Sequence, residues 1–149
     1  MRKKSEAQMF LEQPEKLDAM VKCKLIEKEQ LRELALGITA SMDGERVQSS
    51  GAKSKMANAV ERLVDAEAEI DSLVDELIDT KKKVIQTIER LDSATEYKLL
   101  HLRYIQYVPL KNIADEWNVE YTTITTTHGR ALKNVQRILE GSANETTQT

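Results

Sequence analysis

The stretch "YTTITTT" (Tyr121 to Thr127) has the most unusual side-chain chemistry in this sequence, because five threonines present hydroxyl and methyl groups together. Such β-branched residues favour an extended chain. As a strand, however, the stretch would have no face with a hydrophobic set worth burying. As a helix, Ile124 begins one apolar stripe that continues through His128, Ala131, Val135 and Ile138. The pattern therefore predicts a helix.

The threonines make that helix locally unfavourable, by roughly 2–3 kcal/mol in total relative to alanine. Tertiary packing must offset this cost. We interpret the surface of small hydroxyl and methyl groups as a clue to function. The alternative interpretation is an exposed helical face that binds nothing.

The rest of the chain lacks the residue patterns of an enzyme. It has no glycine-rich phosphate loop, no metal-spaced histidine or cysteine cluster and no nucleophile arrangement. We therefore expect no catalytic residue, no metal and no cofactor. His101 and His128 have no second ligand at metal spacing, and the carboxylates of residues 65–79 have the spacing of a solvent-facing helix surface. The lone Cys23 fits a small buried hydrophobe in a reducing cytoplasm.

Composition predicts an all-α protein. Of the 149 residues, 32% are charged and 4% are aromatic, with five glycines and two prolines. No apolar run approaches the roughly 18 residues of a membrane span, and the basic start is not followed by the apolar stretch of a secretory signal. Residues 93–140 carry six basic and five acidic groups, which is not the strongly basic balance of a high-affinity nucleic-acid binder.

The N-terminal third is predicted to hold one helix between irregular segments. Residues 1–15 are expected to form a flexible N-terminus, with Pro14 just before or at a helix start. A helix from residue 16 to about residue 36 leads into a stretch with three glycines and four serines, residues 37–54. We interpret that stretch as a linker or an ordered loop and as the clearest boundary in the chain.

Residues 55–92 are predicted to form a long amphipathic helix with a heptad pattern. Eight apolar residues fall on its a and d positions: Val60, Leu63, Ile70, Val74, Leu77, Val84, Ile88 and Leu91. Glu67 and Lys81 interrupt the a series, while Val64, Ile78 and Ile85 widen the stripe. Such a face needs a partner. One candidate partner is the first helix, folded back as an antiparallel hairpin. The other is a second copy of the chain, and a dimer can also form in addition to the hairpin.

Residues 93–140 are predicted to form a bundle of shorter helices. Ser93 or Thr95 can cap the first of them. Pro109 ends that helix and precedes a short one at residues 110–117. The last helix runs from Tyr121 to a C-cap at Gly141, and residues 141–149 are expected to be a disordered tail.

The spacing after Pro109 matches a helix-turn-helix. With Leu110 as position one, Ile113 and Ala114 fill the positions where two helices approach, and Asn118 takes the turn position, which needs a left-handed backbone. The predicted apolar core of the motif is Ile113, Ala114, Trp117, Val119, Ile124 and Leu132. Thr127 departs from the pattern at a usually apolar position. Gly129 is expected where helices pack closely.

The signatures "LRY", "IADEWNV" and "GRALKNV" within residues 99–135 carry a resemblance to a known group. The segment resembles region four of bacterial housekeeping sigma factors. It is more similar to small phage and mobile-element proteins built on that module, including the late-gene transcription activators of the RinA and ArpU type. The resemblance extends over about residues 55–140.

This resemblance implies a cytoplasmic, non-enzymatic DNA-binding regulator in a bacterial host cell. By position, it assigns base contacts to Tyr121, Thr122, Thr125 and Thr126. It assigns phosphate contacts to Lys111, Thr123, Arg130 and Lys133. Related helices are rich in arginine and glutamate, whereas this one has no basic residue between Val119 and Gly129. Weak binding by a single module is therefore expected.

Double-stranded DNA is thus the expected partner, with RNA polymerase or a second copy, joined through residues 55–91, as further candidates. Two other functions fit the same elements. One is a DNA-packaging recognition subunit of the small-terminase type, which also joins a helix-turn-helix to oligomerising helices. The other is a protein that docks on RNA polymerase and binds little DNA.

Overall fold

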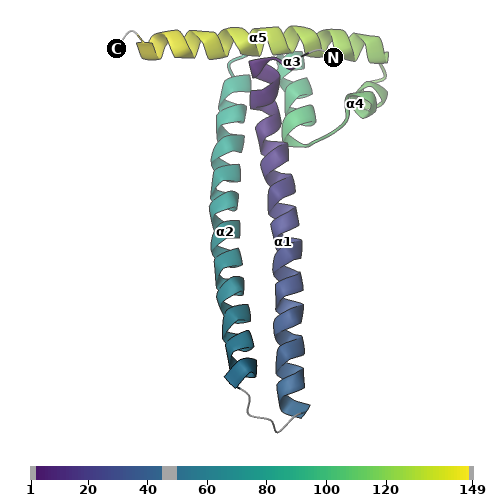
Figure 1. Ribbon diagram of the computed structural model, residues 1–149. Coiled ribbons are helices and arrows are strands. Elements are labelled where there is room, and N and C mark those ends of the chain that lie inside the picture. Colours follow the sequence, from purple (N-terminus) through teal and green to yellow (C-terminus); the bar gives the residue numbers. More distant parts are fainter. Residues whose placement is uncertain (1–2, 45–49, 148–149) are drawn as a thin grey trace. The chain divides into compact units, whose positions relative to one another are not determined.

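The structure is a computed structural model that describes residues 3–44 and 50–147. In this part of the chain every regular element is helical, which confirms the all-α prediction (Figure 1). The elements in chain order are α1 (Glu6–Gly44), α2 (Ser50–Ile88), α3 (Ala94–Leu100), the π-helical turn η1 (His101–Ile105), α4 (Leu110–Glu116) and α5 (Tyr121–Thr147).

The chain divides into two compact units, and α1 and α2 each contribute to both. The first, which we call the arm, is Leu17–Glu76. The second, which we call the HTH unit, combines Met1–Lys16 with Leu77–Thr149. The helix-turn-helix therefore belongs to a unit that also contains the first turns of α1 and the last turns of α2.

Within the arm, α1 and α2 lie side by side as an antiparallel hairpin (Figure 1). Lys24 Nζ lies 3.5 Å from Glu69 and Lys28 Nζ lies 3.3 Å from Glu67, so residue numbers rise along one helix as they fall along the other. The buried residues between the helices are Val21, Ala35, Ala59 and Ile70. The antiparallel hairpin that the sequence offers as one partner for the heptad face is therefore present.

The heptad pattern correctly predicts which side of α2 is buried, although some apolar residues of the pattern are exposed. Ile70, Val84 and Ile88 are buried, whereas Val60 is 48% exposed. The three apolar residues beside the a and d positions differ in exposure. Ile85 is half-buried, while Val64 and Ile78 are exposed. One neighbouring helix covers only one side of α2, and that leaves the flank of the stripe in solvent. Cys23 is also exposed, so the expected buried position is wrong.

The N-terminus differs from the flexible segment predicted for residues 1–15. Helix α1 begins at Glu6, and the Ser5 hydroxyl accepts a hydrogen bond of 3.2 Å from the Gln8 backbone N–H as an N-cap. Ala7 and Leu11 are fully buried in the HTH unit. Pro14 lies inside the helix and is also buried, not at a helix start. Burial of this apolar stripe outweighs the backbone hydrogen bond that proline cannot donate.

Two predicted breaks are helical instead. Residues 37–44 continue α1 and residues 50–54 begin α2, so the loop expected over residues 37–54 is wrong for these two segments. Residues 45–49 lie outside the described residues. Gly141 was expected to cap the last helix, yet α5 continues to Thr147. A disordered tail from residue 141 is therefore wrong as far as Thr147. Glycine lowers helix propensity by about 1 kcal/mol, and that is too little to end a helix by itself.

The HTH unit has two hydrophobic clusters. The first cluster joins α1, α2, α3, η1 and α5 through Ala7, Leu11, Val84, Ile88, Leu100, Tyr104, Ala131 and Val135. The second cluster joins α3, α4 and α5 through Leu99, Ile113, Ala114 and Ile124. The first anchors the middle of α5, and the second fixes its first turns against α4.

Candidate nucleic-acid interface

Helix α4 starts where the sequence predicts, because proline fixes the backbone there. Pro109 is the N-cap, with φ −61° and ψ 146°, and its carbonyl accepts from the Ile113 N–H at 3.1 Å. The helix that precedes it ends in η1, where the Gln106 N–H donates to the His101 carbonyl at 3.1 Å. The chain then turns through Tyr107, which has a φ of 62°.

The turn between α4 and α5 ends α4 with a paired hydrogen-bond motif. The Val119 N–H donates to the Ala114 carbonyl at 3.0 Å, and the Asn118 N–H donates to the Asp115 carbonyl at 3.2 Å. These are the two bonds of a Schellman motif, which needs a left-handed residue after the helix. Asn118 supplies it with φ 53°, so the turn assignment from the sequence is confirmed.

The second cluster holds the two helices of the motif together, although two predicted members are elsewhere. Ile113, Ala114 and Ile124 are buried as expected, and Trp117 packs against them while half-buried. Val119 donates its N–H to the Ala114 carbonyl but its side chain is 40% exposed, so its predicted place in the core is wrong. Leu132 packs against the first cluster, since it is two turns of α5 beyond Ile124.

Of the predicted base-contact residues, Thr122 and Thr126 lie on the side of α5 opposite the buried Ile124, whereas Tyr121 and Thr125 lie at its flank. Ile124 is 1% exposed, whereas Tyr121 is 53% exposed. Thr122 and Thr126 are also exposed, and Thr125 is half-buried. The first two turns of α5 therefore hold one apolar anchor and present tyrosine and threonine to solvent.

Hydrogen bonds to the backbone occupy three of the threonine hydroxyls. Thr125 and Thr126 both donate to the Thr122 carbonyl, at 3.0 and 2.8 Å, and Thr127 donates to the Thr123 carbonyl at 2.9 Å. Such bonds to the preceding turn are the usual way in which threonine is accommodated in a helix. They satisfy the hydroxyl protons without any partner outside the helix.

The predicted phosphate-contact residues are all exposed: Lys111 on α4, and Thr123, Arg130 and Lys133 on α5. Among the described residues, none of these three cations forms an ion pair. They are thus available to an anionic partner. Gly129, by contrast, has no heavy atom within 4 Å of the place where a Cβ would lie. The expected close packing at Gly129 is therefore wrong.

His128 ties the middle of α5 to η1. Its Nε2 and the Tyr104 hydroxyl share a hydrogen bond of 2.6 Å, and the two rings stack 5.7 Å apart. Burial lowers the pKa of His128 from 6.5, and the nearby Arg103 guanidinium lowers the same pKa further. Burial also raises the pKa of Tyr104 to about 12. Both side chains are therefore neutral near pH 7, so this pair positions the helix and carries no charge.

Two contacts of α5 were not anticipated from the sequence. Asn134 donates to the buried Glu96 carboxylate at 2.8 Å, and the Gln136 carboxamide accepts from the Ala7 N–H at 3.0 Å. The sequence does mark the two segments that Asn134 and Gln136 contact as helix starts. Both "SATE" (residues 93–96) and "SEAQ" (residues 5–8) have the spacing of a capping box. Ser93 does cap α3, accepting from the Glu96 N–H at 3.3 Å.

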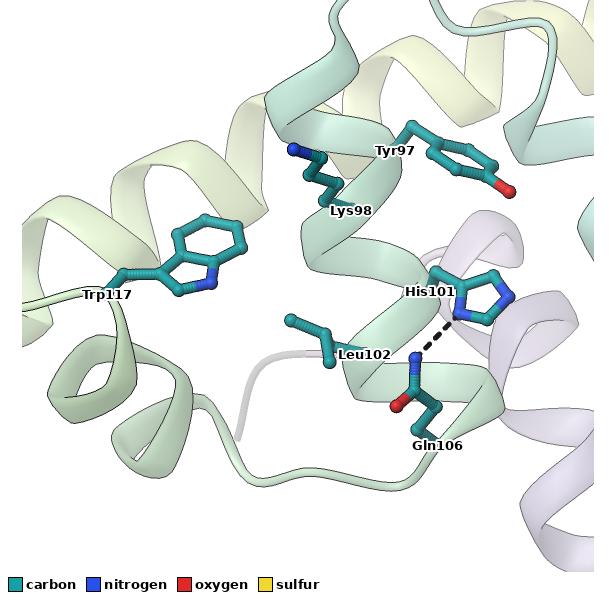
Figure 2. Close-up of a pocket in the computed structure, with 6 residues that line it drawn as sticks. All are labelled: Tyr97, Lys98, His101, Leu102, Gln106 and Trp117. Carbon is teal, nitrogen blue, oxygen red and sulfur yellow. Dashed lines mark hydrogen bonds between the residues drawn. The ribbon is translucent and has the colours of Figure 1, made fainter.

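An open groove of about 320 Å³ lies beside the motif. Figure 2 shows Trp117 on one side and Tyr97 and His101 on the other, with Lys98 and Leu102 between them. Gln106 Nε2 donates to His101 Nδ1 at 3.0 Å. The groove is amphipathic, and its lining has one lysine, one histidine and no carboxylate.

The residues that the structure describes include no group of three or more histidine, cysteine, aspartate or glutamate side chains that could hold a metal ion. None of the described helices is long and apolar enough to span a membrane.

Comparison with known proteins gives one family. No curated protein and no solved structure matches the chain. A family described as "Protein of unknown function (DUF1492)" matches residues 38–136. The match includes α2, the helix-turn-helix and the start of α5 through Gln136, which is well over half of the chain. The protein therefore belongs to the DUF1492 family.

Proposed function

We propose that this protein is a sequence-specific DNA-binding regulator of phage or mobile-element transcription in the bacterial cytoplasm. It acts through α4 and α5, without catalysis. The observation that carries the proposal is the two-sided start of α5, where Ile124 is buried against α4 while Tyr121, Thr122 and Thr126 face solvent. In DNA-binding helix-turn-helix proteins the second helix enters the major groove with its N-terminal residues against the bases.

Three exposed cations supply the phosphate contacts in this proposal. Lys111, Arg130 and Lys133 lie on the two helices of the motif. Neutralising three phosphates gives a slope of log affinity against log salt of about −3 for one module, and about −5 for a dimer. A single module is accordingly a weak binder. A homodimer through α2, which has exposed apolar side chains at Val60, Val64 and Ile78, would double the contacts.

The polymerase-docking function is the second candidate. It is favoured by the lack of any cation on the first two turns of α5 and by the exposed apolar side chains of Val64 and Ile78 on α2. In that case the heptad helix α2 is the contact surface for polymerase, and alanine at Tyr121 and Thr125 has no effect.

The test is selection from a pool of random short duplexes by the full-length protein, with and without RNA polymerase, over a salt series. We expect one motif to be enriched and its binding to be lost in the variant with both Tyr121→Ala and Thr125→Ala. Thr95→Ala, an exposed threonine outside α5, is the matched control and should bind like the wild type.

Light scattering on the same samples separates the alternatives. A monomer or dimer agrees with regulation, while a ring of many subunits would identify a packaging subunit. If polymerase binds the protein but no duplex is enriched, the DNA-binding proposal fails and the docking function replaces it.

A further inference from the structure

The hydrogen bonds of the threonines restrict what α5 can offer to a base pair. Thr125 and Thr126 have donated their hydroxyl protons to the same carbonyl, that of Thr122. Each side chain is left with oxygen lone pairs and one methyl group. Toward a ligand these two residues are therefore hydrogen-bond acceptors and apolar contacts, not donors.

The neighbouring side chains do not replace the missing donors. Residues 121–127 include no arginine, lysine, asparagine or glutamine. His128 follows, and its Nε2 is engaged with the Tyr104 hydroxyl. The side-chain donors that remain in residues 121–127 are the hydroxyls of Tyr121, Thr122 and Thr123, and none of them is the cationic donor that usually contacts guanine.

Base pairs differ in what they require of such a surface. In the major groove guanine presents two acceptors, N7 and O6, which arginine or lysine usually contacts. Adenine presents the N6 amine, which is a donor, and thymine presents its 5-methyl group. Acceptor lone pairs suit adenine N6 and the cytosine N4 amine alike, whereas the threonine methyl groups suit the 5-methyl group that only thymine carries, and so favour A·T pairs.

We propose that α5 recognises A·T base pairs, with the methyl groups of Thr125 and Thr126 against thymine methyls and their hydroxyl oxygens accepting from adenine N6. This inference rests on the proposed DNA-binding function and names the sequence class that the function would select. In this inference Thr125 and Thr126 determine sequence specificity. The phosphate contacts of Lys111, Arg130 and Lys133 contribute affinity that does not depend on the DNA sequence.

Replacing thymidine by deoxyuridine tests the inference, because the exchange removes only the 5-methyl group. The duplex enriched by the full-length protein is resynthesised with each thymidine replaced in turn, and affinity is measured by fluorescence anisotropy. We expect one or two positions at which the exchange weakens binding about fourfold, the effect of one buried methyl group. The remaining positions should be unaffected.

Variants at Thr126 assign the contact to a residue. Thr126→Ser removes the protein methyl and should weaken binding to the thymidine duplex about fourfold, with little further loss on the deoxyuridine duplex. Thr126→Val keeps a methyl group and should retain the sensitivity to deoxyuridine. Thr127→Ser is the matched control, because Thr127 makes the same backbone bond but is assigned no base contact. Circular dichroism verifies that each variant remains helical.

The possible outcomes distinguish failure of the A·T inference from failure of the proposed DNA-binding function on which it rests. An enriched motif whose essential positions are G·C pairs, or one bound equally well with every thymidine replaced, overturns the A·T inference and leaves DNA binding intact. Failure to enrich any duplex, with polymerase present or absent, overturns both.

Discussion

At the scale of single residues, the threonine run is compatible with a helix because its hydroxyls have partners within the helix. Thr125, Thr126 and Thr127 each donate to a carbonyl of the preceding turn. The propensity cost remains, and burial of Ile124, Ala131 and Val135 offsets it. This stretch is helical because of what its few apolar residues contact, not because of what most of its residues prefer.

Gly129 gives a prediction at this scale. Because it lies inside α5 without a positive φ and with open space around its Cβ position, Gly129→Ala should raise the free energy of unfolding by about 0.5–1 kcal/mol. Urea denaturation measures the change. Gly141→Ala, also in open space but nearer the end of α5, should give a smaller gain. A loss of stability in Gly129→Ala would mean that a partner helix packs there after all.

His128 gives a prediction for pH. Its pKa is lowered in the folded protein, so the unfolded chain binds the extra proton more readily and gains population as the pH falls below about 6.5. The stability contributed by neutral His128 is thus present above that pH and is lost below it. We expect the unfolding free energy to decline from pH 7 to pH 5, and the decline to be shallower in His128→Gln. Equal slopes in the two proteins would contradict this.

At the scale of elements, caps and turns decide where the helices begin and end. Ser5 and Ser93 accept from the N–H three residues on, Pro109 fixes the start of α4, and the Schellman motif ends it. These devices fix the starts of α1, α3 and α4 and the end of α4. The proposed recognition surface of α5 therefore depends on residues to which no DNA contact is assigned.

Asn118 is the most direct test of this dependence. Its φ of 53° costs most L residues roughly 1–2 kcal/mol, but asparagine less and glycine least. Asn118→Ala should therefore lower the free energy of unfolding by about 1 kcal/mol, whereas Asn118→Gly should leave it unchanged or higher. Asn112→Ala, an exposed asparagine inside α4, is the control and should not destabilise. Equal effects of alanine and glycine at residue 118 would exclude backbone strain as the cause.

At the scale of the whole molecule, the helix-turn-helix is completed by segments from the far end of the chain. Ala7 and Leu11 are buried beside Val84, Tyr104 and Ala131 in one cluster, and Ala7 also donates its N–H to Gln136. The N-terminal turns of α1 thus form part of the unit that carries the proposed DNA-binding surface. The arm, in contrast, has its own buried residues between α1 and α2.

This arrangement predicts a large effect from a residue distant in sequence. Leu11→Ala should lower the free energy of unfolding of the HTH unit by about 2–5 kcal/mol, because it removes a fully buried side chain. Met9→Ala, on the same helix but 50% exposed, should change it by less than about 0.5 kcal/mol. Denaturation followed by the fluorescence of Trp117 reports on this unit. Equal, small effects would show that the N-terminal turns do not stabilise it.

The sequence by itself determined the fold class, the heptad side of α2, the start of α4 and the left-handed turn at Asn118. Each of these follows from local rules of periodicity, proline geometry or backbone sterics, which act over a few residues. Tertiary structure alone decided that α1 begins at Glu6 with Pro14 inside it, that Val119 and Cys23 are exposed and that Gly129 lies in open space. These features depend on which distant segments of the chain supply apolar surface. Burial is set by tertiary contacts, and the local sequence pattern does not specify them.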